Sequence, residues 1–155
     1  MKRLDNFLNW YYSTSIPIKE IEVIMFKMSE AAAIALHSVI YMANRDGKIC
    51  TLKEIANKFS ISENHLSKVL QRLVKAGALD SIKGPKGGFL IKDKYKNMSF
   101  LDVYELIEGK VQQNNCLFHS SHNGCTSCIM NGLVQKLNNE FVEYMKSHKI
   151  TDFVF

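Results

Sequence analysis

Three features of the sequence predict a mostly α-helical fold with one small β-hairpin. Apolar residues recur at helical spacing in several segments, and most of these segments open on a Ser or Thr that can cap a helix. A glycine-rich stretch at residues 84–88 joins two short apolar runs, as in a tight hairpin. A long apolar stripe follows near the C-terminus. The 155 residues, 46% hydrophobic and 23% charged, suit one compact domain or one small domain with an attached element.

The first predicted helix runs from Glu30 to about Arg45, with Ser29 as its N-terminal cap. Its apolar positions repeat at inward spacing: Ala32, Ala35, Leu36, Val39, Ile40 and Ala43. His37 lies among them, and we expect it to be a hydrogen-bonded core histidine rather than a ligand. The apolar run at residues 31–43 is shorter than the about 20 residues that cross a bilayer, so it predicts a buried helix.

A capping box predicts the start of the second helix: the Thr51 hydroxyl accepts from the Glu54 amide, and the Glu54 carboxylate reaches back. This helix ends at residues 60–61, and Ser62 caps a third helix that runs to Gly77. The third helix has an apolar face of Leu66, Val69, Leu70, Leu73 and Val74. Its other face has no acidic residue after Glu63. The residues on that face are Asn64, His65, Ser67, Lys68, Gln71, Arg72 and Lys75. Solvated helix faces usually mix both signs of charge, so this asymmetry favours a phosphate-bearing partner.

Two short strands, at residues 79–83 and 89–92, flank the segment Gly84-Pro85-Lys86-Gly87-Gly88. Its glycines allow a tight, exposed hairpin tip, with Lys83 and Lys86 at or beside it. A short helix, a tight turn, a helix with a basic outer face and a hairpin together predict a winged helix-turn-helix domain.

Positive charge is concentrated in this domain. Residues 49–96 carry ten basic and four acidic side chains, a net charge of +6 within a chain of net charge +5. Double-stranded DNA is the expected partner, ahead of an anionic membrane, and a domain used only for protein contact is the alternative. The third helix would enter the major groove while the hairpin lies along phosphates. The residues predicted to contact DNA are Ser62, Asn64, His65, Ser67, Lys68, Arg72, Lys83 and Lys86.

The C-terminal part is predicted to hold a short helix, a polar loop and a long helix. Ser99 caps the short helix at residues 100–108, and Gly109 ends it. The last helix is expected to follow the loop directly, with a long apolar stripe of Ile129, Met130, Leu133, Leu137, Phe141, Tyr144 and Met145. One small domain cannot easily bury this stripe, so the pattern predicts a long C-terminal dimerisation helix in a homodimer.

The loop carries cysteines with the spacing C-x8-C-x2-C, at Cys116, Cys125 and Cys128. Thiolates are ligands for iron-sulfur clusters and for zinc, and His119 or His122 can complete a tetrahedral zinc site. Free thiols or a reversible Cys125–Cys128 disulfide are the alternatives. A thiol-disulfide enzyme would need a βαβ setting that the sequence lacks, and no other catalytic arrangement is present, so no enzyme is expected. The fourth cysteine, Cys50, is expected to be a small buried hydrophobe.

Several motifs together resemble the Rrf-two family of bacterial transcription regulators, over residues 28 to the end. They are Leu52-Lys53-Glu54-Ile55-Ala56, Ile61-Ser62, Lys75-Ala76-Gly77, Lys83-Gly84-Pro85-Lys86-Gly87-Gly88-Phe89, Asp102-Val103 and Ile107-Glu108-Gly109. The resemblance implies a homodimeric winged-helix regulator, usually a repressor, whose DNA affinity is set by an iron-sulfur cluster or another signal. It places base-reading residues at Asn64, His65 and Ser67 and a basic wing residue at Lys83.

The chain departs from the family at both kinds of site. The family members that regulate iron-sulfur assembly carry Ser, Tyr and Glu at the three base-reading positions and Arg in the wing. We therefore expect this chain to bind an operator that differs from theirs. The family's cysteines are commonly spaced C-x5-C-x5-C; Cys116 and Cys128 keep the outer span, His122 takes the middle position, and the second cysteine is Cys125. The expected sensor is therefore a [2Fe-2S] or [4Fe-4S] cluster on these three cysteines with His122. Zinc, or a thiol switch without metal, is the alternative.

We expect three parts: an N-terminal extension at residues 1–24, the DNA-binding domain at 25–96, and the short helix, cysteine loop and dimerisation helix at 97–155. The extension is rich in aromatic residues, and it is either a misplaced translation start or a helix that packs on the partner subunit. Its first apolar stretch is broken by Asp5, Asn6 and Asn9, unlike a secretory signal. A cytoplasmic protein is therefore expected, in which cysteines stay reduced and no membrane is a partner.

Overall fold

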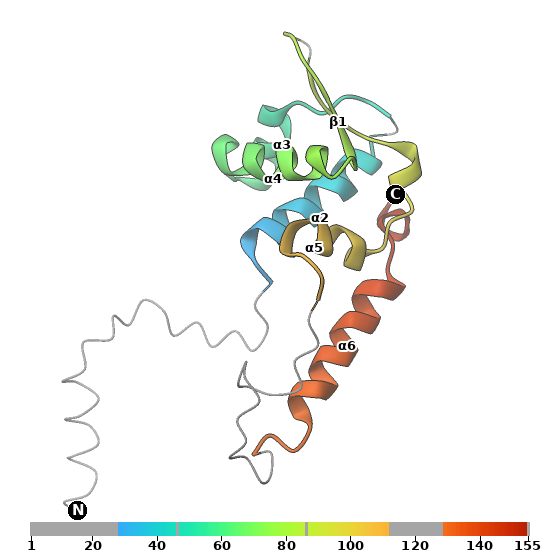
Figure 1. Ribbon diagram of the computed structural model, residues 1–155. Helices are drawn as coiled ribbons and strands as arrows, with labels where there is room; N and C mark the ends of the chain where they lie inside the picture. The colour runs from blue at the N-terminus through green and yellow to red at the C-terminus, as the bar shows by residue number, and fades with distance from the viewer. Residues whose placement is uncertain (1–27, 46, 86, 112–128, 155) are drawn as a thin grey trace, which may run out of the picture.

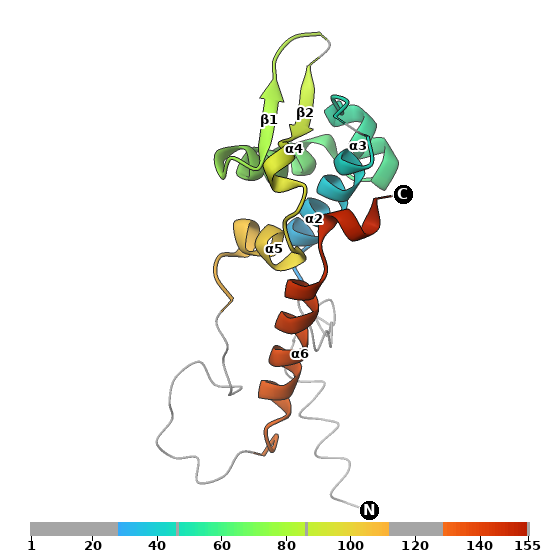
Figure 2. The same ribbon diagram turned by 90° about the vertical axis from the view of Figure 1, so that its right-hand side faces the viewer.

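The structure, a computed structural model, describes residues 28–45, 47–85, 87–111 and 129–154. The predicted N-terminal extension, Lys86, and the predicted ligands Cys116, His122, Cys125 and Cys128 lie outside these residues. The described helices are α2 (Glu30–Ala43), α3 (Leu52–Phe59), α4 (Glu63–Lys75), α5 (Phe100–Glu108) and α6 (Leu133–Ser147). The strands are β1 (Leu79–Ile82) and β2 (Gly88–Ile91), and two 3-10 turns are η2 (Asp93–Tyr95) and η3 (Ile150–Phe153). Helices α2 to α5 form one body, from which the hairpin projects at one end and α6 at the other (Figure 1, Figure 2).

Helix α2 is the centre of this body. Its side chains are buried on almost every side: Ala32, Ile34, Ala35, Leu36, Ser38, Val39, Met42 and Ala43. They pack against α4, α5, β2 and η3. As predicted, the Ser29 hydroxyl caps the helix by accepting from the Ala32 amide at 3.0 Å. A helix that is apolar all round has to be covered on all sides, which explains why four elements gather on this one.

The predicted capping box of α3 is half right. The Thr51 hydroxyl accepts from the Glu54 amide at 3.2 Å, as expected. The Glu54 carboxylate does not provide the return bond, because its Oε1 instead accepts from the Tyr41 hydroxyl at 2.7 Å and from Arg45 Nη2 at 2.5 Å. The hydrogen bond to this carboxylate raises the pKa of Tyr41 above its ordinary value. Glu54 therefore joins the start of α3 to the last turns of α2.

Helix α4 follows α3 through a short turn in which Ser60 adopts a left-handed conformation (φ 55°). The Ser62 hydroxyl caps α4 by accepting from the His65 amide at 3.2 Å. The predicted apolar face is confirmed: Leu66, Val69, Leu70 and Leu73 are buried. This burial leaves the polar face of α4 on the outside of the body.

Strands β1 and β2 pair in an antiparallel hairpin, with register from Leu79 opposite Ile91 to Ile82 opposite Gly88. Cys50 forms an isolated bridge to β2, in which its amide donates to the Phe89 carbonyl at 2.9 Å and its carbonyl accepts from the Phe89 amide at 2.8 Å. Cys50 is fully buried, as expected for a small hydrophobe. The hairpin is thus attached to the chain just before α3 as well as to α4.

The C-terminus returns to the body after α6. The Phe100 amide at the start of α5 donates to the His148 carbonyl at 2.9 Å, and the Ile150 amide donates to the Met98 carbonyl at 3.0 Å. Asn44, which ends α2, donates through Nδ2 to the Phe153 carbonyl at 3.0 Å. These bonds fix the C-terminal end of α6 to α2 and α5, while its other end extends away from the body (Figure 1).

The last helix begins later than the sequence predicts. Residues 129–132 form turns, and α6 starts at Leu133 because Asn131 (φ 44°) and Gly132 (φ 79°) adopt left-handed conformations that interrupt a helix. Ile129, expected on the stripe, is 90% exposed. Within α6 only Met145 is buried, so most of the stripe remains accessible. None of the helices described here has both the length and the apolar character needed to span a membrane.

Gly88 is the position where the hairpin meets the chain before α3 most tightly. A Cβ atom there would lie 2.4 Å from the Cys50 carbonyl oxygen and 2.8 Å from Ile49 Cγ2. We expect Gly88→Ala to lower the free energy of unfolding by about 1–3 kcal/mol, the usual cost of overpacking. Urea denaturation measures this, with Ser81→Ala on the exposed side of β1 as the control. Equal stability of the two variants would contradict the packing of Gly88 against Cys50.

Candidate nucleic-acid interface

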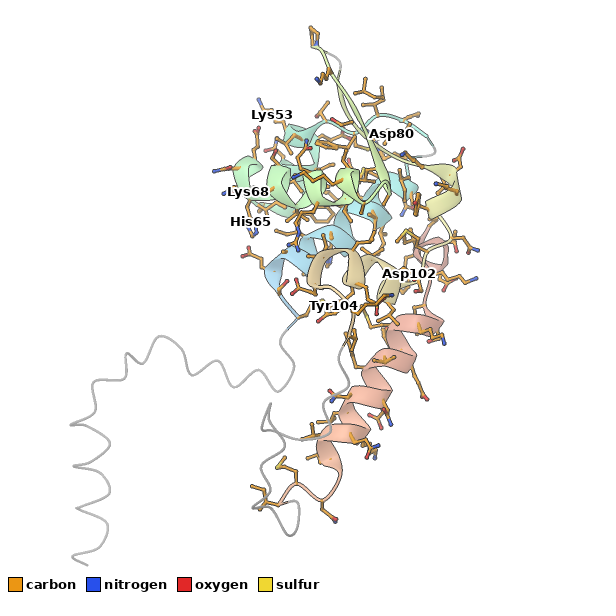
Figure 3. The ribbon with its side chains drawn as sticks, viewed as in Figure 1. Lys53, His65, Lys68, Asp80, Asp102 and Tyr104 are labelled. Atoms are coloured by element: carbon orange, nitrogen blue, oxygen red, sulfur yellow. The ribbon has the colours of Figure 1, made fainter. Side chains whose placement is uncertain are left out.

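The outer face of α4 carries most of the residues predicted to contact DNA. Ser62, Asn64 and Lys68 are exposed, and His65 and Ser67 are half-buried. Lys83 is exposed just after β1, where the hairpin leaves the body. Figure 3 shows Lys53, Lys68 and His65 along one edge of the body, and Figure 2 shows the hairpin projecting beyond α3 and α4. The three labelled residues of α3 and α4 therefore lie on one side of the body, and the hairpin extends beyond these two helices.

Several carboxylates of this domain pair with basic side chains of the protein. Asp80 Oδ1 lies 3.2 Å from Lys92 Nζ, and Asp93 Oδ1 lies 2.8 Å from Lys96 Nζ. The Glu54 carboxylate is engaged by Arg45. Exposed lysines remain on both helices of the pair and on the wing: Lys53, Lys58, Lys68, Lys75 and Lys83. Lys53 and Lys58 were not among the predicted contacts, although their spacing opposite the apolar face of α3 could have identified them.

The His65 side chain contacts the protein on one side and solvent on the other. Its Nδ1 lies 3.7 Å from Glu30 Oε2 at the start of α2, so the ring is directed partly toward the protein. Asn64, the preceding residue, is exposed at the first turn of α4. Of these two predicted base-reading residues, Asn64 is therefore the one presented to solvent without a partner element over it.

Arg72 has a contact inside the protein. Its guanidinium donates a hydrogen bond to the main-chain carbonyl of Ile107, in the last turn of α5. This contact joins the C-terminal half of α4 to the end of the helix that precedes the cysteine segment.

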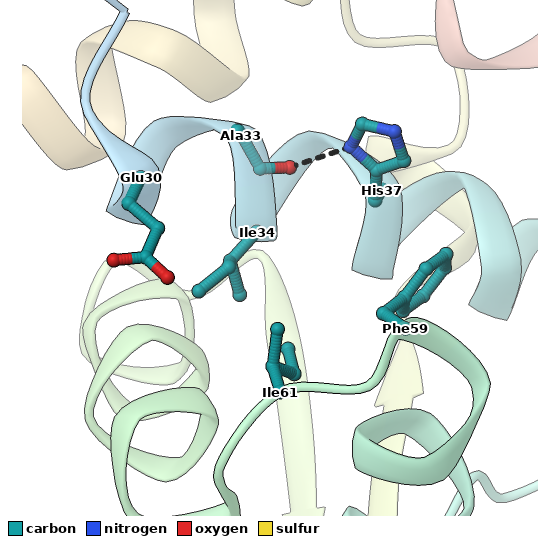
Figure 4. Close-up of a pocket in the computed structure, with 6 residues that line it drawn as sticks. All are labelled: Glu30, Ala33, Ile34, His37, Phe59 and Ile61. Carbon is teal, nitrogen blue, oxygen red and sulfur yellow. Dashed lines mark hydrogen bonds between the residues drawn. The ribbon is translucent and has the colours of Figure 1, made fainter.

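A small groove lies between the first half of α2 and the turn that joins α3 to α4 (Figure 4). It is lined by Glu30, Ala33, Ile34, His37, Phe59 and Ile61. His37 Nδ1 lies 2.8 Å from the Ala33 carbonyl oxygen, and the ring meets Phe59 edge to face at 5.6 Å. The predicted hydrogen bond of His37 is thus confirmed. Its predicted place in the core is wrong, because the residue is exposed at the edge of this groove.

The cysteine segment starts from a well-held end of α5. The Val111 amide donates to Glu105 Oε1 at 3.3 Å, and Lys110 pairs with the same carboxylate. Among the residues that the structure describes, no group of three or more His, Cys, Asp or Glu side chains is placed to hold a metal ion. Cys50 is buried, and it is distant in sequence from the end of α5. Burial raises the pKa of its thiol, which keeps the thiol protonated and unreactive.

Comparison with known proteins identifies the family. The model of the Rrf2 family, described as "Iron-dependent Transcriptional regulator", matches residues 28–155. The chain belongs to the Rrf2 family. It is 29% identical over 120 residues to the HTH-type transcriptional regulator NsrR of Bacillus subtilis (strain 168), covering 77% of this chain and 82% of that protein.

Solved structures support the same fold. The structure of CymR, the global cysteine regulator of B. subtilis, has a TM-score of 0.67 and 22% identity, covering 83% of this chain and 95% of that one. T. potens IscR has a TM-score of 0.62 and 20% identity, covering 83% of this chain and 85% of that one. The winged-helix fold and the resemblance to Rrf2 regulators are confirmed. The relatives are transcription regulators, so DNA binding follows from the family and the expectation that the chain is no enzyme is confirmed.

Proposed function

We propose that this Rrf2 regulator is a homodimeric repressor that binds DNA through α4 and the wing, and that the cysteine segment controls its affinity. The observation that carries the proposal is the outer face of α4 and the hairpin, on which Lys68, Lys75 and Lys83 are exposed while Asp80 is paired with Lys92. Phosphate contacts supply most of the affinity for DNA, whereas base-edge contacts supply the sequence preference.

The residues divide between these two tasks by chemistry. Asn64 is exposed at the first turn of α4 and can make a bidentate contact with adenine. Ser62, Ser67 and His65 lie on the same turns and can donate or accept at base edges or phosphates. Lys68, Lys83 and Lys86 are assigned to phosphates, because an ammonium group acts there as a point charge.

Salt dependence tests the assignment of the lysines. We expect Lys68→Ala and Lys83→Ala each to weaken binding on all sequences and to reduce the slope of log Kd against log salt by about 1. Asn64→Ala should cost about 1–3 kcal/mol at one base position only. Fluorescence anisotropy on sites selected from random DNA measures both effects, and Lys146→Ala on α6 is the control. Unchanged salt slopes for both lysine variants would contradict this interface.

The exposed stripe of α6 supports a dimer. Leu133 is 41% exposed and Tyr144 is 53% exposed, and Leu137 and Phe141 on the same stripe are only half-buried. Two copies of such a helix can cover each other's apolar face around a two-fold axis. A two-fold axis would also place two copies of α4 on successive major grooves, about one helical turn apart.

A charge on the stripe should separate the subunits. We expect Leu137→Glu to produce monomers, because the carboxylate would be buried without a partner in the dimer and solvated in the monomer. Sedimentation velocity measures the mass, and DNA binding to a two-half-site operator should fall with it. Gln135→Glu adds the same charge to an exposed position of α6 off the stripe and should leave the dimer intact. A dimeric Leu137→Glu protein would mean that α6 does not form the interface.

The donor set of the cysteine segment fits an iron-sulfur cluster. Cys116, Cys125 and Cys128 supply three thiolates and His122 supplies an imidazole, and these are ligands that clusters accept. A bound cluster would supply a group that responds to oxidation and to nitric oxide. The same donors also suit zinc, or a switch that uses only the thiols. The iron-dependent description of the family model favours the cluster.

Metal analysis separates these sensors. We expect protein purified without oxygen to contain iron and acid-labile sulfide and to absorb visible light, and Cys125→Ser to lose both. Cys50→Ala should keep both, because Cys50 is buried against the hairpin. Stoichiometric zinc without iron would show that the cysteine segment holds a zinc site instead of a cluster. A metal-free protein whose oxidant response is abolished by Cys125→Ser would establish the thiol switch.

A further inference from the structure

Arg72 lies on the basic side of α4 but is used within the protein. Its guanidinium donates to the Ile107 carbonyl in the last turn of α5. The last carbonyls of a helix lack partners in the helix and carry partial negative charge. A guanidinium with several fixed donors suits such a site well. The contact therefore supplies a partner for the end of α5 and uses the charge that the sequence assigns to DNA.

A second path joins the same end of α5 to the start of α4. The Ser29 hydroxyl donates to Glu108 Oε1 at 2.5 Å while it accepts from the Ala32 amide, so Glu108 holds the cap of α2. The next residue, Glu30, lies 3.7 Å from His65 Nδ1 on α4. Helix α4 is thus connected to the end of α5 near both of its own ends: directly at Arg72, and through the cap of α2 at His65.

The end of α5 is also held from the other side. Glu105 pairs with Lys110 and accepts from the Val111 amide, and its side chain is only 16% exposed. Glu105 and Ile107 lie in the same last turns of α5. A displacement of the chain after Gly109 therefore acts on the helix end that carries the carbonyl bound by Arg72.

We infer that Arg72 is a positioning residue that couples the end of α5 to the recognition helix α4, and that it is not a phosphate contact. The inference rests on the proposed function, because its regulatory part needs a sensor in the segment after α5. Two sites are coupled when each changes the affinity at the other by the same factor, typically about 5–150-fold. Arg72 would carry a large share of this factor, since its side chain is hydrogen-bonded directly from α4 to the end of α5.

The test compares Arg72→Gln with Lys68→Gln, because each removes one positive charge from α4. Three quantities are measured on the full-length protein: the salt slope of DNA binding, the hydrogen exchange of the Gly109 and Val111 amides, and the ratio of Kd values before and after oxidation. We expect Lys68→Gln to reduce the salt slope by about 1 and to leave exchange and ratio unchanged. Arg72→Gln should keep the salt slope, speed the exchange, and bring the ratio to about 1.

Each contrary result has a distinct meaning. A reduced salt slope with unchanged exchange in Arg72→Gln would show a phosphate contact and overturn the inference. Faster exchange with an unchanged Kd ratio would show a purely structural contact and overturn the coupling. If oxidation leaves the Kd of the wild type unchanged, the proposed sensor is wrong. The salt slope and the hydrogen exchange then still decide whether Arg72 holds α5. If Arg72→Gln does not fold, Glu108→Ala, which removes the Ser29 link without changing α4, should lower the ratio; an unchanged ratio there overturns the coupling.

Discussion

The burial of α2 on nearly all sides is the constraint on which the remaining structure depends. Small residues on this helix, Ala32, Ala35 and Ala43, let its neighbours approach closely, while Val39 and Met42 fill the space between them. Because α4, α5, β2 and η3 all contact this one helix, they belong to a single core. A shift of any of them has to be accommodated by α2, since close-packed interiors transmit displacement.

Polar contacts then determine how the covering elements are oriented. Glu54 receives Tyr41 and Arg45 and so fixes α3 against the last turns of α2. Asn44 donates to the Phe153 carbonyl and so holds the C-terminal turn against the end of α2. Ser29 and Glu108 hold the first turn of α2 to α5. The two ends of α2 are therefore fixed to different parts of the chain, and α4 packs against the same helix.

The basic residues of the described domain differ in whether they have a partner within the protein, and the net charge does not reveal this difference. Arg45, Lys92 and Lys96 pair with carboxylates of the protein, and Arg72 binds a helix carbonyl. Lys53, Lys68 and Lys83 remain exposed. Of these exposed lysines, Lys68 and Lys83 are the ones that we propose to contact phosphates.

Local chemistry is what the sequence by itself determined. The caps at Ser29, Thr51, Ser62 and Ser99, the apolar face of α4 and the glycine-rich hairpin are confirmed, because each depends on residues within one or two helical turns or on backbone freedom at glycine. The family could be named for the same reason, since its motifs are short and contiguous. The last helix starts later than its apolar pattern predicts, because Asn131 and Gly132 adopt left-handed conformations.

The tertiary structure decided which partner each long side chain meets. The Glu54 carboxylate accepts from Tyr41 and Arg45 instead of capping its own helix, and Arg72 donates to a carbonyl 35 residues away. His37 remains exposed, although its ring contacts Phe59. Cys50 joined the hairpin through Phe89. Long side chains can reach several partners, so their contacts depend on which elements the burial of α2 brings together, and spacing along the chain does not contain that information.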